Sequence, residues 1–444
     1  MAKKQLTIEE KLQAALVPVE EQPYKVPENW CWSYLENVCQ IIMGQSPKGA
    51  DTTMDDSYTP LIGGAADLGD NAPIINKYTK SVTKLSQCGD LIICIRATLG
   101  RPVIADGEYC LGRGVAGCRS SRIDISFLRF FFINFERYLY DNATGSTFAQ
   151  VTSKVLGKMP IPLPPFLEQS RIVARIESLF AKLDEAKEKI QEVLDGADLR
   201  RAAILHQAFT GKLTEKWRTE HGVSIKQWEK KKLKECGKWM GGGTPSMSHA
   251  EYWENGDIPW ITAKDMKADN IETTQMYTNM LGISNSSANY NDKPSVIFVM
   301  RSGILRRKLP IATVKMPYTV NQDLKAVTPE DIDVDYLFWV CESNEKNILR
   351  RCMKNGTTVE SIDSKALLEF EIPIAPLEEQ SIIVDRVVKL IDQEQMANQA
   401  AESALTIIDT LKKSILARAF RGELGTNDPS EASAKELLQE ILAS

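Results

Sequence analysis

Residues 165–170 read Pro-Phe-Leu-Glu-Gln-Ser, and residues 376–381 read Pro-Leu-Glu-Glu-Gln-Ser. The two glutamines are 380 − 169 = 211 positions apart, and this offset holds without a gap to Leu213 and Leu424. A self-similarity of about half the chain is much longer than the ~20–50-residue period of solenoid repeats. The chain therefore contains two copies of one large unit.

The duplication extends upstream, where matching residues are separated by more divergent sequence. Trp30, Leu35, Gly44 and Pro47 match Trp228, Leu233, Gly242 and Pro245 at an offset of 198, and Gly145 and Lys154 match Gly356 and Lys365 at 211. Each unit thus joins a variable block of about 140 residues to a well-matched block of about 45. This organisation suggests a molecule that inspects two related targets.

The matched blocks have a helical period, with apolar residues at alternating spacings of four and three. Arg200 interrupts the first seam and Glu394 the second. A seam of about six heptads is typical of a coiled coil, and each helix should be about 65 Å long. The predicted seam positions are Ile172, Ile176, Leu179, Leu183, Ala186, Ile190, Val193, Ala197 and Ile204 in the first block and Ile383, Val387, Leu390, Ala397, Ala401, Ala404, Ile408, Leu411 and Ile415 in the second.

The two helices are expected to pair with each other. They share one register, and the alanines of the second seam allow a partner backbone to approach closely. Prolines before each block suit the first turn of a helix, and Gly211 and Gly422 suit its C-terminal cap. The alternative is two independent helices that cover separate cores.

Composition and charge narrow the class of protein. With 444 residues, 43% of them apolar, the chain is typical of a soluble protein of two or three domains. The N-terminus shows no signal peptide, and nine scattered cysteines without a Cys-x-x-Cys pair indicate a reducing cytoplasm and no metal site. A net charge of −5 is unusual for a protein that binds nucleic acid, so tight binding of a long polyanion would require partners.

Catalytic motifs are missing from the sequence. Residues 241–246 resemble a phosphate-binding loop only in their glycines and lack its lysine. There is also no Gly-x-Gly-x-x-Gly, no His-Glu-x-x-His and no Asn-Pro-Pro-aromatic run. The chain is therefore predicted to be a binding protein and not an enzyme.

The variable blocks are predicted to be mixed α/β. Helices are expected near 125–140 and 334–354. One buried strand in each block ends on an arginine, Arg96 or Arg301, just before a loop. Such an arginine is either a structural ion-pair partner or a ligand contact. Short apolar runs bounded by turn residues predict strands at 60–63, 90–96, 102–105, 259–262, 295–301 and 310–314.

The order of these blocks resembles the DNA specificity (S) subunit of type I restriction-modification enzymes. Residues 165–213 and 376–424 correspond to the two spacer regions of that family, and residues 44–47 and 242–246 correspond to the glycine-proline turn that opens its target recognition domains. The resemblance covers nearly the whole chain. It implies two α/β (α+β) target recognition domains joined by two long helices that form an antiparallel coiled coil, with pseudo-two-fold internal duplication.

The resemblance also implies domain limits, partners and cofactors. Each recognition domain would read one half of a bipartite, asymmetric DNA site, while two methyltransferase subunits and two restriction (motor) subunits complete the enzyme. S-adenosylmethionine, ATP and Mg²⁺ would bind those partners and not this chain. The expected segments are an N-terminal helical segment at 1–23, recognition domains at 24–164 and 216–375, spacer helices at 165–215 and 376–424, and a tail helix at 425–444.

Base reading would require side chains that reach the edges of the bases, with further side chains on phosphates. The candidates in the first domain are Gln45, Ser46, Lys48, Arg96, Arg101, Arg113, Ser146 and Thr147. Those in the second are Thr244, Ser246, Lys264, Arg301, Arg306, Arg307, Lys308, Gln322, Thr357 and Thr358.

Contact with the methyltransferase subunits would involve the outward faces around Arg171, Arg175, Phe209, Arg386 and Phe420. The alternative for both phenylalanines is packing at the base of the recognition domains. The terminal segments 8–16 and 434–442 look helical and either pair with each other or offer another partner surface.

Two other classes of function stay open. One is a coiled-coil scaffold whose globular blocks bind proteins, and the other is a self-sufficient methyltransferase. The missing cofactor loop disfavours the second. The scaffold does not explain why the two blocks diverge yet keep matching anchors.

Overall fold

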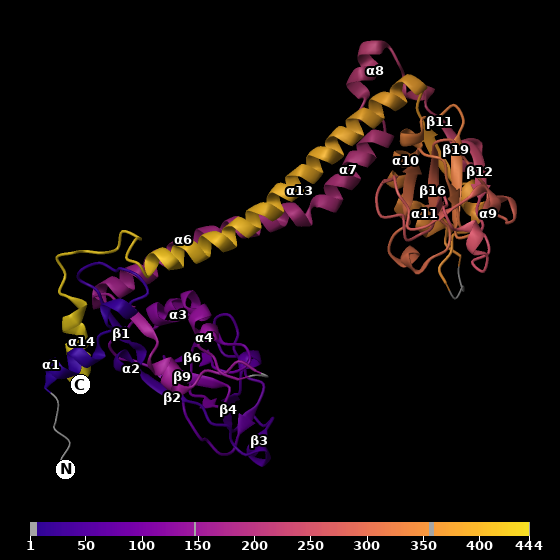
Figure 1. Ribbon diagram of the computed structural model, residues 1–444. Helices are drawn as coiled ribbons and strands as arrows, with labels where there is room; N and C mark the ends of the chain where they lie inside the picture. The colour runs from indigo at the N-terminus through magenta and orange to yellow at the C-terminus, as the bar shows by residue number, and fades with distance from the viewer. Residues whose placement is uncertain (1–6, 146–147, 355–358, 444) are drawn as a thin grey trace. The chain divides into compact units, whose positions relative to one another are not determined.

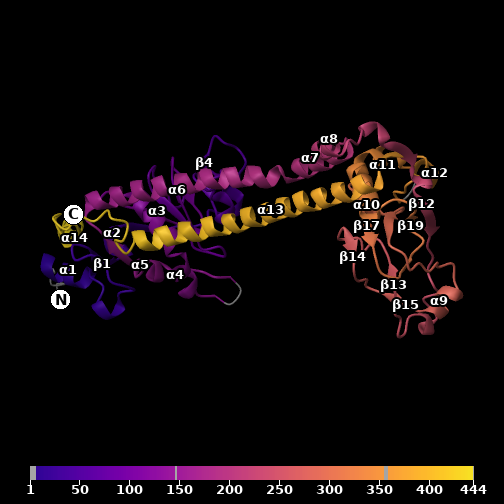
Figure 2. The same cartoon turned by 90° about the horizontal axis from the view of Figure 1, so that it is seen from above.

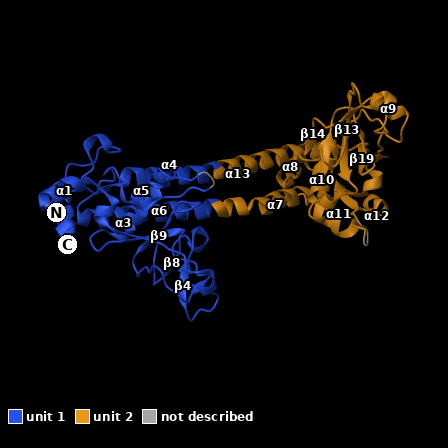
Figure 3. Ribbon diagram, turned by 60° about the horizontal axis from the view of Figure 1, so that its bottom comes forward, with its two compact units in different colours: residues 1–190, 403–444 blue, residues 191–402 orange. Residues whose placement is uncertain are grey.

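The computed structural model describes residues 7–145, 148–354 and 359–443. Internal contacts divide the chain into two compact units, of which unit 1 holds residues 1–190 and 403–444 and unit 2 holds residues 191–402 (Figure 3). Each unit has its own apolar core. Each also combines one variable block with parts of both matched helical blocks.

Unit 1 contains an antiparallel four-stranded sheet in the order β2-β9-β6-β7, a second sheet in the order β3-β5-β4-β8, and the two-stranded ladder β1-β10 (Figure 1). The elements are α1 (Ile8–Ala15), β1 (Cys31–Tyr34), α2 (Leu35–Val38), β2 (Gln40–Met43), β3 (Thr52–Thr53), β4 (Thr59–Ile62), β5 (Tyr78–Thr79), β6 (Leu91–Cys94), β7 (Gly100–Ile104), β8 (Cys110–Leu111), β9 (Val115–Arg119), α3 (Ile125–Asn134), α4 (Glu136–Asp141), α5 (Ser153–Gly157), β10 (Pro160–Leu163), α6 (Phe166–Asp195) and α14 (Ala434–Ala443).

Unit 2 repeats this plan with additions. Its main sheet has the order β12-β19-β16-β17-β14, in which the edge strand β14 runs parallel to β17. The elements are α7 (Ala197–Phe209), α8 (Glu215–His221), β11 (Glu229–Lys232), β12 (Gly237–Gly241), β13 (Ile258–Ile261), β14 (Asn270–Ile271), β15 (Tyr277–Thr278), α9 (Met280–Ser284), β16 (Ser295–Val299), β17 (Ile311–Val314), β18 (Thr319–Val320), β19 (Leu324–Pro329), α10 (Val334–Ser343), α11 (Glu345–Cys352), α12 (Ser364–Leu368), β20 (Glu371–Ile374) and the first part of α13 (Leu377–Ala419), whose residues from 403 onward belong to unit 1.

The same kind of local signal starts the helix behind each main sheet. Asp124 caps α3 by accepting hydrogen bonds from the next backbone amides, and Asp333 caps α10 in the same way. Both helices are mostly apolar, and their apolar residues are buried against strands β6 and β7 in unit 1 and β16 and β17 in unit 2. The predicted fold class, two α/β copies with long helices, is confirmed.

The long helices pair within each unit, and in each the partners are antiparallel (Figures 1 and 2). In unit 1, Lys412 of α13 contacts Asp184 of α6. In unit 2, Glu394 of α13 contacts Arg200 of α7. Residue numbers therefore rise along one helix as they fall along its partner. The predicted pairing in place of two independent helices is confirmed.

The predicted seam is wrong at some positions. Val193 and Leu411 are about 42% and 43% exposed, and Ala397 is exposed as well. The first block is not one helix, because α6 ends at Asp195 and α7 begins at Ala197, with Gly196 between them. An undistorted helix also drifts by about 20° per heptad relative to a strict seven-residue repeat. A strict four-three pattern therefore assigned to the buried seam some residues that are exposed.

The two terminal helices lie against each other in unit 1. Leu12 of α1 and Leu438 of α14 are buried in one cluster, and Lys11 Nζ donates to the Leu442 carbonyl at 3.5 Å. Of the two roles considered for these segments, the structure shows pairing. In the part of the chain that the structure describes, no helix combines the length and the apolar character that crossing a bilayer requires.

Candidate nucleic-acid interface

The Glu-Gln pair of the repeated motif is buried at the first turn of each long helix. In unit 1, Glu168 accepts hydrogen bonds from Trp30 Nε1 at 2.7 Å, Asn427 Nδ2 at 2.8 Å and Thr426 Oγ1 at 3.3 Å. Gln169 Oε1 accepts from the backbone N–H of Asp124 at 2.9 Å, and Asp124 is the cap of α3. The motif therefore ties the helix to its domain.

Unit 2 builds the same joint with a different compensating group. Trp228 Nε1 donates to Glu379 at 2.7 Å, and Gln380 Oε1 accepts from the backbone N–H of Asp333 at 2.8 Å. Here Glu379 also accepts from Arg218 Nη1 at 2.6 Å, in an ion pair whose side chains are only 9% and 0% exposed. A buried carboxylate requires such partners, because its desolvation is costly.

The glycine-proline turn follows β2 in unit 1 and β12 in unit 2, and in both it packs closely against neighbouring backbone. A Cβ on Gly44 would lie 2.1 Å from the carbonyl oxygen of Gly112, and one on Gly242 would lie 1.9 Å from that of Val320. Only glycine fits at such distances. In unit 1 this turn leaves Gln45 and Ser46 exposed.

The unit 1 mouth, defined by Arg96, Arg113, Phe148 and Gln150, surrounds a hollow of about 680 Å³. Arg96 Nε and Nη2 donate to Gln150 Oε1 at 3.0 and 2.7 Å. The backbone N–H of Arg113 donates to Ser46 Oγ at 3.2 Å, which brings the glycine-proline turn to the same place. Three of the predicted candidates therefore lie together.

The unit 2 mouth, defined by Arg301, Gln322, Asp323 and Lys354, surrounds a hollow of about 530 Å³. Arg301 Nε donates to Asp323 Oδ1 at 2.7 Å, and Thr244 Oγ1 donates to Gln322 Oε1 at 2.5 Å. Three predicted candidates, Thr244, Arg301 and Gln322, thus lie at one site. Arg301 also has the ion-pair role that the sequence left open.

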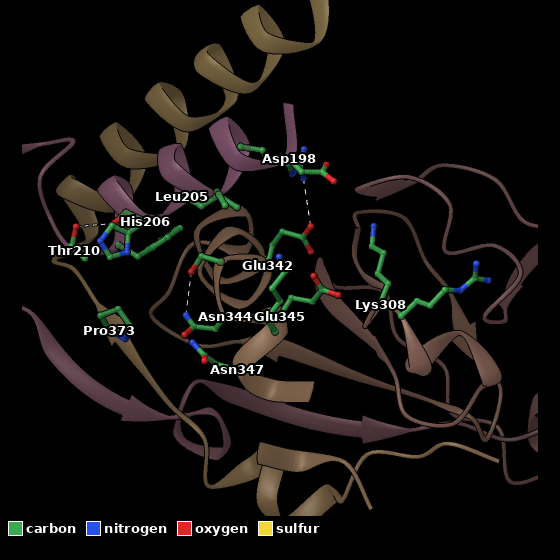
Figure 4. Close-up of a pocket in the computed structure, with 16 residues that line it drawn as sticks. Asp198, Leu205, His206, Thr210, Lys308, Glu342, Asn344, Glu345, Asn347 and Pro373 are labelled. Carbon is green, nitrogen blue, oxygen red and sulfur yellow. Dashed lines mark hydrogen bonds and ion pairs between the residues drawn. The ribbon is translucent and has the colours of Figure 1, made fainter. Parts of the chain in front are cut away.

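Other predicted candidates are not part of these mouths. Arg307 and Lys308 line a separate hollow of about 560 Å³ beside α7, where Figure 4 shows Lys308 opposite Glu342 and Glu345. Burial raises the pKa of Glu342, and Lys308 and Arg201 oppose that rise. Lys264 lies at yet another hollow, with residues 265–275. Arg307 and Lys308 therefore do not share a contact surface with Arg301.

The remaining candidates each have different surroundings. Lys48 and Arg101 are exposed, and Arg101 Nη1 donates to the Ala65 carbonyl at 3.4 Å. Ser246 Oγ lies 2.8 Å from Ser248 Oγ, and Arg306 is paired with Glu360. Four candidates lie outside the described residues: Ser146, Thr147, Thr357 and Thr358.

Sequence reasoning missed Gln150, Phe148 and Lys354. Phe148 is 70% exposed, and each of the three lines a mouth. A signal was available, because the matching glycines Gly145 and Gly356 mark an equivalent loop in both copies. What the sequence did not show is which residues of that loop lie opposite the strand-end arginines.

The residues predicted to bind partners have mixed surroundings. Arg171 is paired with Glu431 at 2.8 Å, and Arg386 Nη1 donates to the Leu213 carbonyl at 2.6 Å. Phe420 is fully buried and Phe209 nearly so, with Phe209 against Tyr336. The structure thus shows packing for both phenylalanines, and partner contact stays a prediction. Arg175 is exposed on α6.

Comparisons with known proteins agree on one family. The model of the type I restriction modification DNA specificity domain matches residues 27–195 and 225–403. The Escherichia coli EcoR124I/EcoR124II specificity subunit is 33% identical over 287 residues, which cover 62% of this chain and 67% of that protein. The EcoKI specificity subunit of E. coli strain K12 is 25% identical over 94% of this chain and 96% of its own length.

Solved structures show the same fold. The HsdS subunit from Thermoanaerobacter tengcongensis aligns with a TM-score of 0.64 at 20% identity, over 91% of this chain and all of that one. A chain from a study of complex assembly in the type I R-M system aligns with a TM-score of 0.67 over 90% of this chain.

Proposed function

This chain belongs to the type I restriction modification DNA specificity family, and on that premise we propose that its two domains each read one half of a divided DNA target. The observation that carries the proposal is the pair of mouths. Each lies at the same position of an equivalent sheet. Each presents an arginine two residues beyond the end of a buried strand, and the two mouths differ in the side chains around that arginine. Equivalent placement with different chemistry is what two readers of different sequences require.

The proposed base-reading and phosphate-holding residues are the candidates at the mouths, with Gln150 and Lys354 added. In unit 1 they are Ser46, Arg96 and Arg113, with Gln45 exposed next to Ser46 on the same turn, and in unit 2 they are Thr244, Arg301 and Gln322. Arginine offers paired donors for guanine, and serine and threonine suit phosphates. Domain limits of 24–164 and 216–375 remain part of the proposal.

The proposal assigns recognition to this chain and catalysis to others. Methyltransferase and restriction subunits, two of each, would bind S-adenosylmethionine, ATP and Mg²⁺, and the complex would act on DNA in the cytoplasm. Those subunits would also supply positive charge to neutralise phosphates, which a chain with a net charge of −5 lacks. Arg175, exposed on α6, is a candidate for their contact.

The first experiment expresses the chain with its modification subunits and maps methylated bases across the host genome. The expected result is one split motif with methylated adenines on opposite strands. A stable complex that methylates nothing would support the protein scaffold instead. A motif without a gap would contradict two separate readers.

The unread gap between the two half-sites provides a second test. We propose that the long helices set this gap, because α13 is one unbroken helix of 43 residues, about 65 Å long. Deleting residues 183–189 and 407–413 together removes one heptad from each partner around the Asp184–Lys412 contact. The loss of about 10 Å should shorten the gap by about three base pairs.

A control deletes residues 407–413 alone. The paired helices are then out of step, so this variant should lose activity instead of changing the gap. A matched deletion that leaves the gap unchanged would rule out the helices as the measure of distance.

A further inference from the structure

The unit 1 mouth holds two side chains opposite each other by backbone pairing. Arg96 and Gln150 are partners in an antiparallel bridge. Backbone hydrogen bonds of 2.8 and 2.9 Å join residues 95–97 to residues 149–151 on either side of that bridge. A bridge of this kind, without hydrogen bonds at the central pair, brings the two side chains close together. The backbone pairing therefore holds the two side chains within reach of each other.

The contact determines which atom of the glutamine amide points at the arginine. Arg96 Nε and Nη2 both bond one atom of Gln150, at 3.0 and 2.7 Å. Arginine has donors only, so that atom must be the carbonyl oxygen Oε1 and cannot be the amide nitrogen. The side-chain acceptor of Gln150 is thus occupied.

The groups that remain are donors. Within residues 7–145, 148–354 and 359–443, neither Gln150 Nε2 nor Arg96 Nη1 has a hydrogen-bond partner. The described lining of the hollow contains Arg113 and no acidic side chain. The pair therefore presents a surface that can donate hydrogen bonds and has no free acceptor.

The chain that follows Arg96 is strained in the loop and at the start of β7, as segments at functional sites often are. Ala97 has φ 63° and Arg101 has φ 48°, in the left-handed region that side chains with a Cβ disfavour. In unit 2 the described residues between Arg301 and Ile311 include no residue of this kind.

We propose, resting on the proposed function, that the Arg96–Gln150 pair reads a guanine in the half-site of the first domain. In the major groove guanine presents two acceptors, N7 and O6, whereas adenine presents an acceptor and a donor and cytosine a donor. A glutamine with a free carbonyl suits adenine. Because Arg96 holds that carbonyl, the amide N–H of Gln150 would meet the N6 amino group of adenine with a second donor.

Phosphate is the other group that a donor surface suits, and the two possibilities predict different outcomes. Loss of a phosphate contact weakens binding about equally for all sequences, whereas loss of a base contact relaxes selectivity at one position. The position of the pair inside a hollow whose described lining contains no lysine favours the base.

The test uses the full chain with its modification subunits and reads the methylated motif by sequencing. Gln150→Glu keeps the length of the side chain and its contact with Arg96, but it replaces the free donor by an acceptor. We expect this variant to lose preference for one guanine, roughly 10- to 100-fold, with the other half-site unchanged. Arg96→Ala should relax the same position. Gln227→Glu, the same chemical change in an exposed turn outside both mouths, should leave the motif unchanged.

Three results would overturn the inference. The first is a wild-type motif with no guanine in the half that Arg301→Ala leaves unchanged. The second is a uniform loss of methylation in Gln150→Glu without any change of motif, which would identify a phosphate contact. The third is an unchanged motif in both variants. If the wild type shows no split motif, the proposed function itself fails, and this result is distinct from the other three.

Discussion

The two units are alike where a long helix joins its domain and different at their mouths. At the joints, Glu168 and Glu379 are equivalent, since 168 + 211 = 379, and each accepts a tryptophan N–H at 2.7 Å. At the mouths, Arg96 bonds Gln150, whereas Arg301 bonds Asp323. The joint is the shared frame, and the mouth is where the copies have been free to diverge.

A finer comparison shows that the contacts of the frame can be kept while their residues change. Lys158 pairs with Glu36 in unit 1. The equivalent positions of unit 2 are 158 + 211 = 369 and 36 + 198 = 234, where Glu369 pairs with Lys234. The two charges have exchanged places. The interaction was retained, although neither residue was.

The largest expected difference concerns the two joints. Arg218→Ala leaves Glu379 buried without its cation and should lower the free energy of unfolding by about 3–5 kcal/mol. Asn427→Ala removes one neutral donor from Glu168 and should lower the free energy of unfolding by about 1–3 kcal/mol. Hydrogen-exchange mass spectrometry of each helix start would measure the two losses separately.

The double variant Arg218→Ala/Glu379→Gln serves as the control, because it removes the stranded charge and should recover part of the loss. Equal losses for Arg218→Ala and Asn427→Ala would show that the joints do not differ as described.

The next effect concerns the mouths. Arg301→Ala should relax base selection only in the half-site of the second domain, by about 1–3 kcal/mol. The methylated motif of the variant, compared with that of the wild type, measures the change. Equal loss in both halves would indicate misfolding and not a lost base contact.

A smaller effect is expected in the paired helices. The ion pair Arg200–Glu394 of unit 2 is replaced in unit 1 by Leu411 and Leu183, since 200 + 211 = 411 and 394 − 211 = 183. Because the pair is partly exposed, a double-mutant cycle with Arg200→Leu and Glu394→Leu should give a coupling of at most about 1 kcal/mol. A coupling of several kcal/mol would mean that this pair, and not the apolar seam, holds the helices.

The smallest effect depends on pH. Lys232 and Lys234 lower the pKa of Glu369 to about 2 from a usual value of 4.5. A carboxyl whose pKa is lower in the folded state stabilises the fold above pH 4.5 and loses that effect as the pH falls toward 2. The stability difference between wild type and Glu369→Gln should therefore be present at pH 7 and smaller at pH 3. A difference that grows on acidification would contradict this sign.

How well the sequence predicted a contact depends on how far apart in the chain its two residues lie. The joint motif and the helices were predictable, because capping, periodicity and the repeat are local or repeated signals. The Arg96–Gln150 contact was not, because the two residues are 54 positions apart and meet only when the loop folds back onto the strand. Arg307 and Lys308 were grouped with Arg301 for the same reason, since a turn at Gly303–Arg306 carries them to another hollow.

The core of unit 1 draws on residues from both ends of the printed chain, and this affects the order in which the units can be completed during synthesis. Leu416, Phe420 and Leu438 belong to the same cluster as Phe127 and Phe131. Unit 2 is contiguous from 191 to 402. Domains usually fold on the ribosome in the order in which they emerge. Unit 1 must wait for residues 403–444, which are made after unit 2, so unit 2 can finish before unit 1.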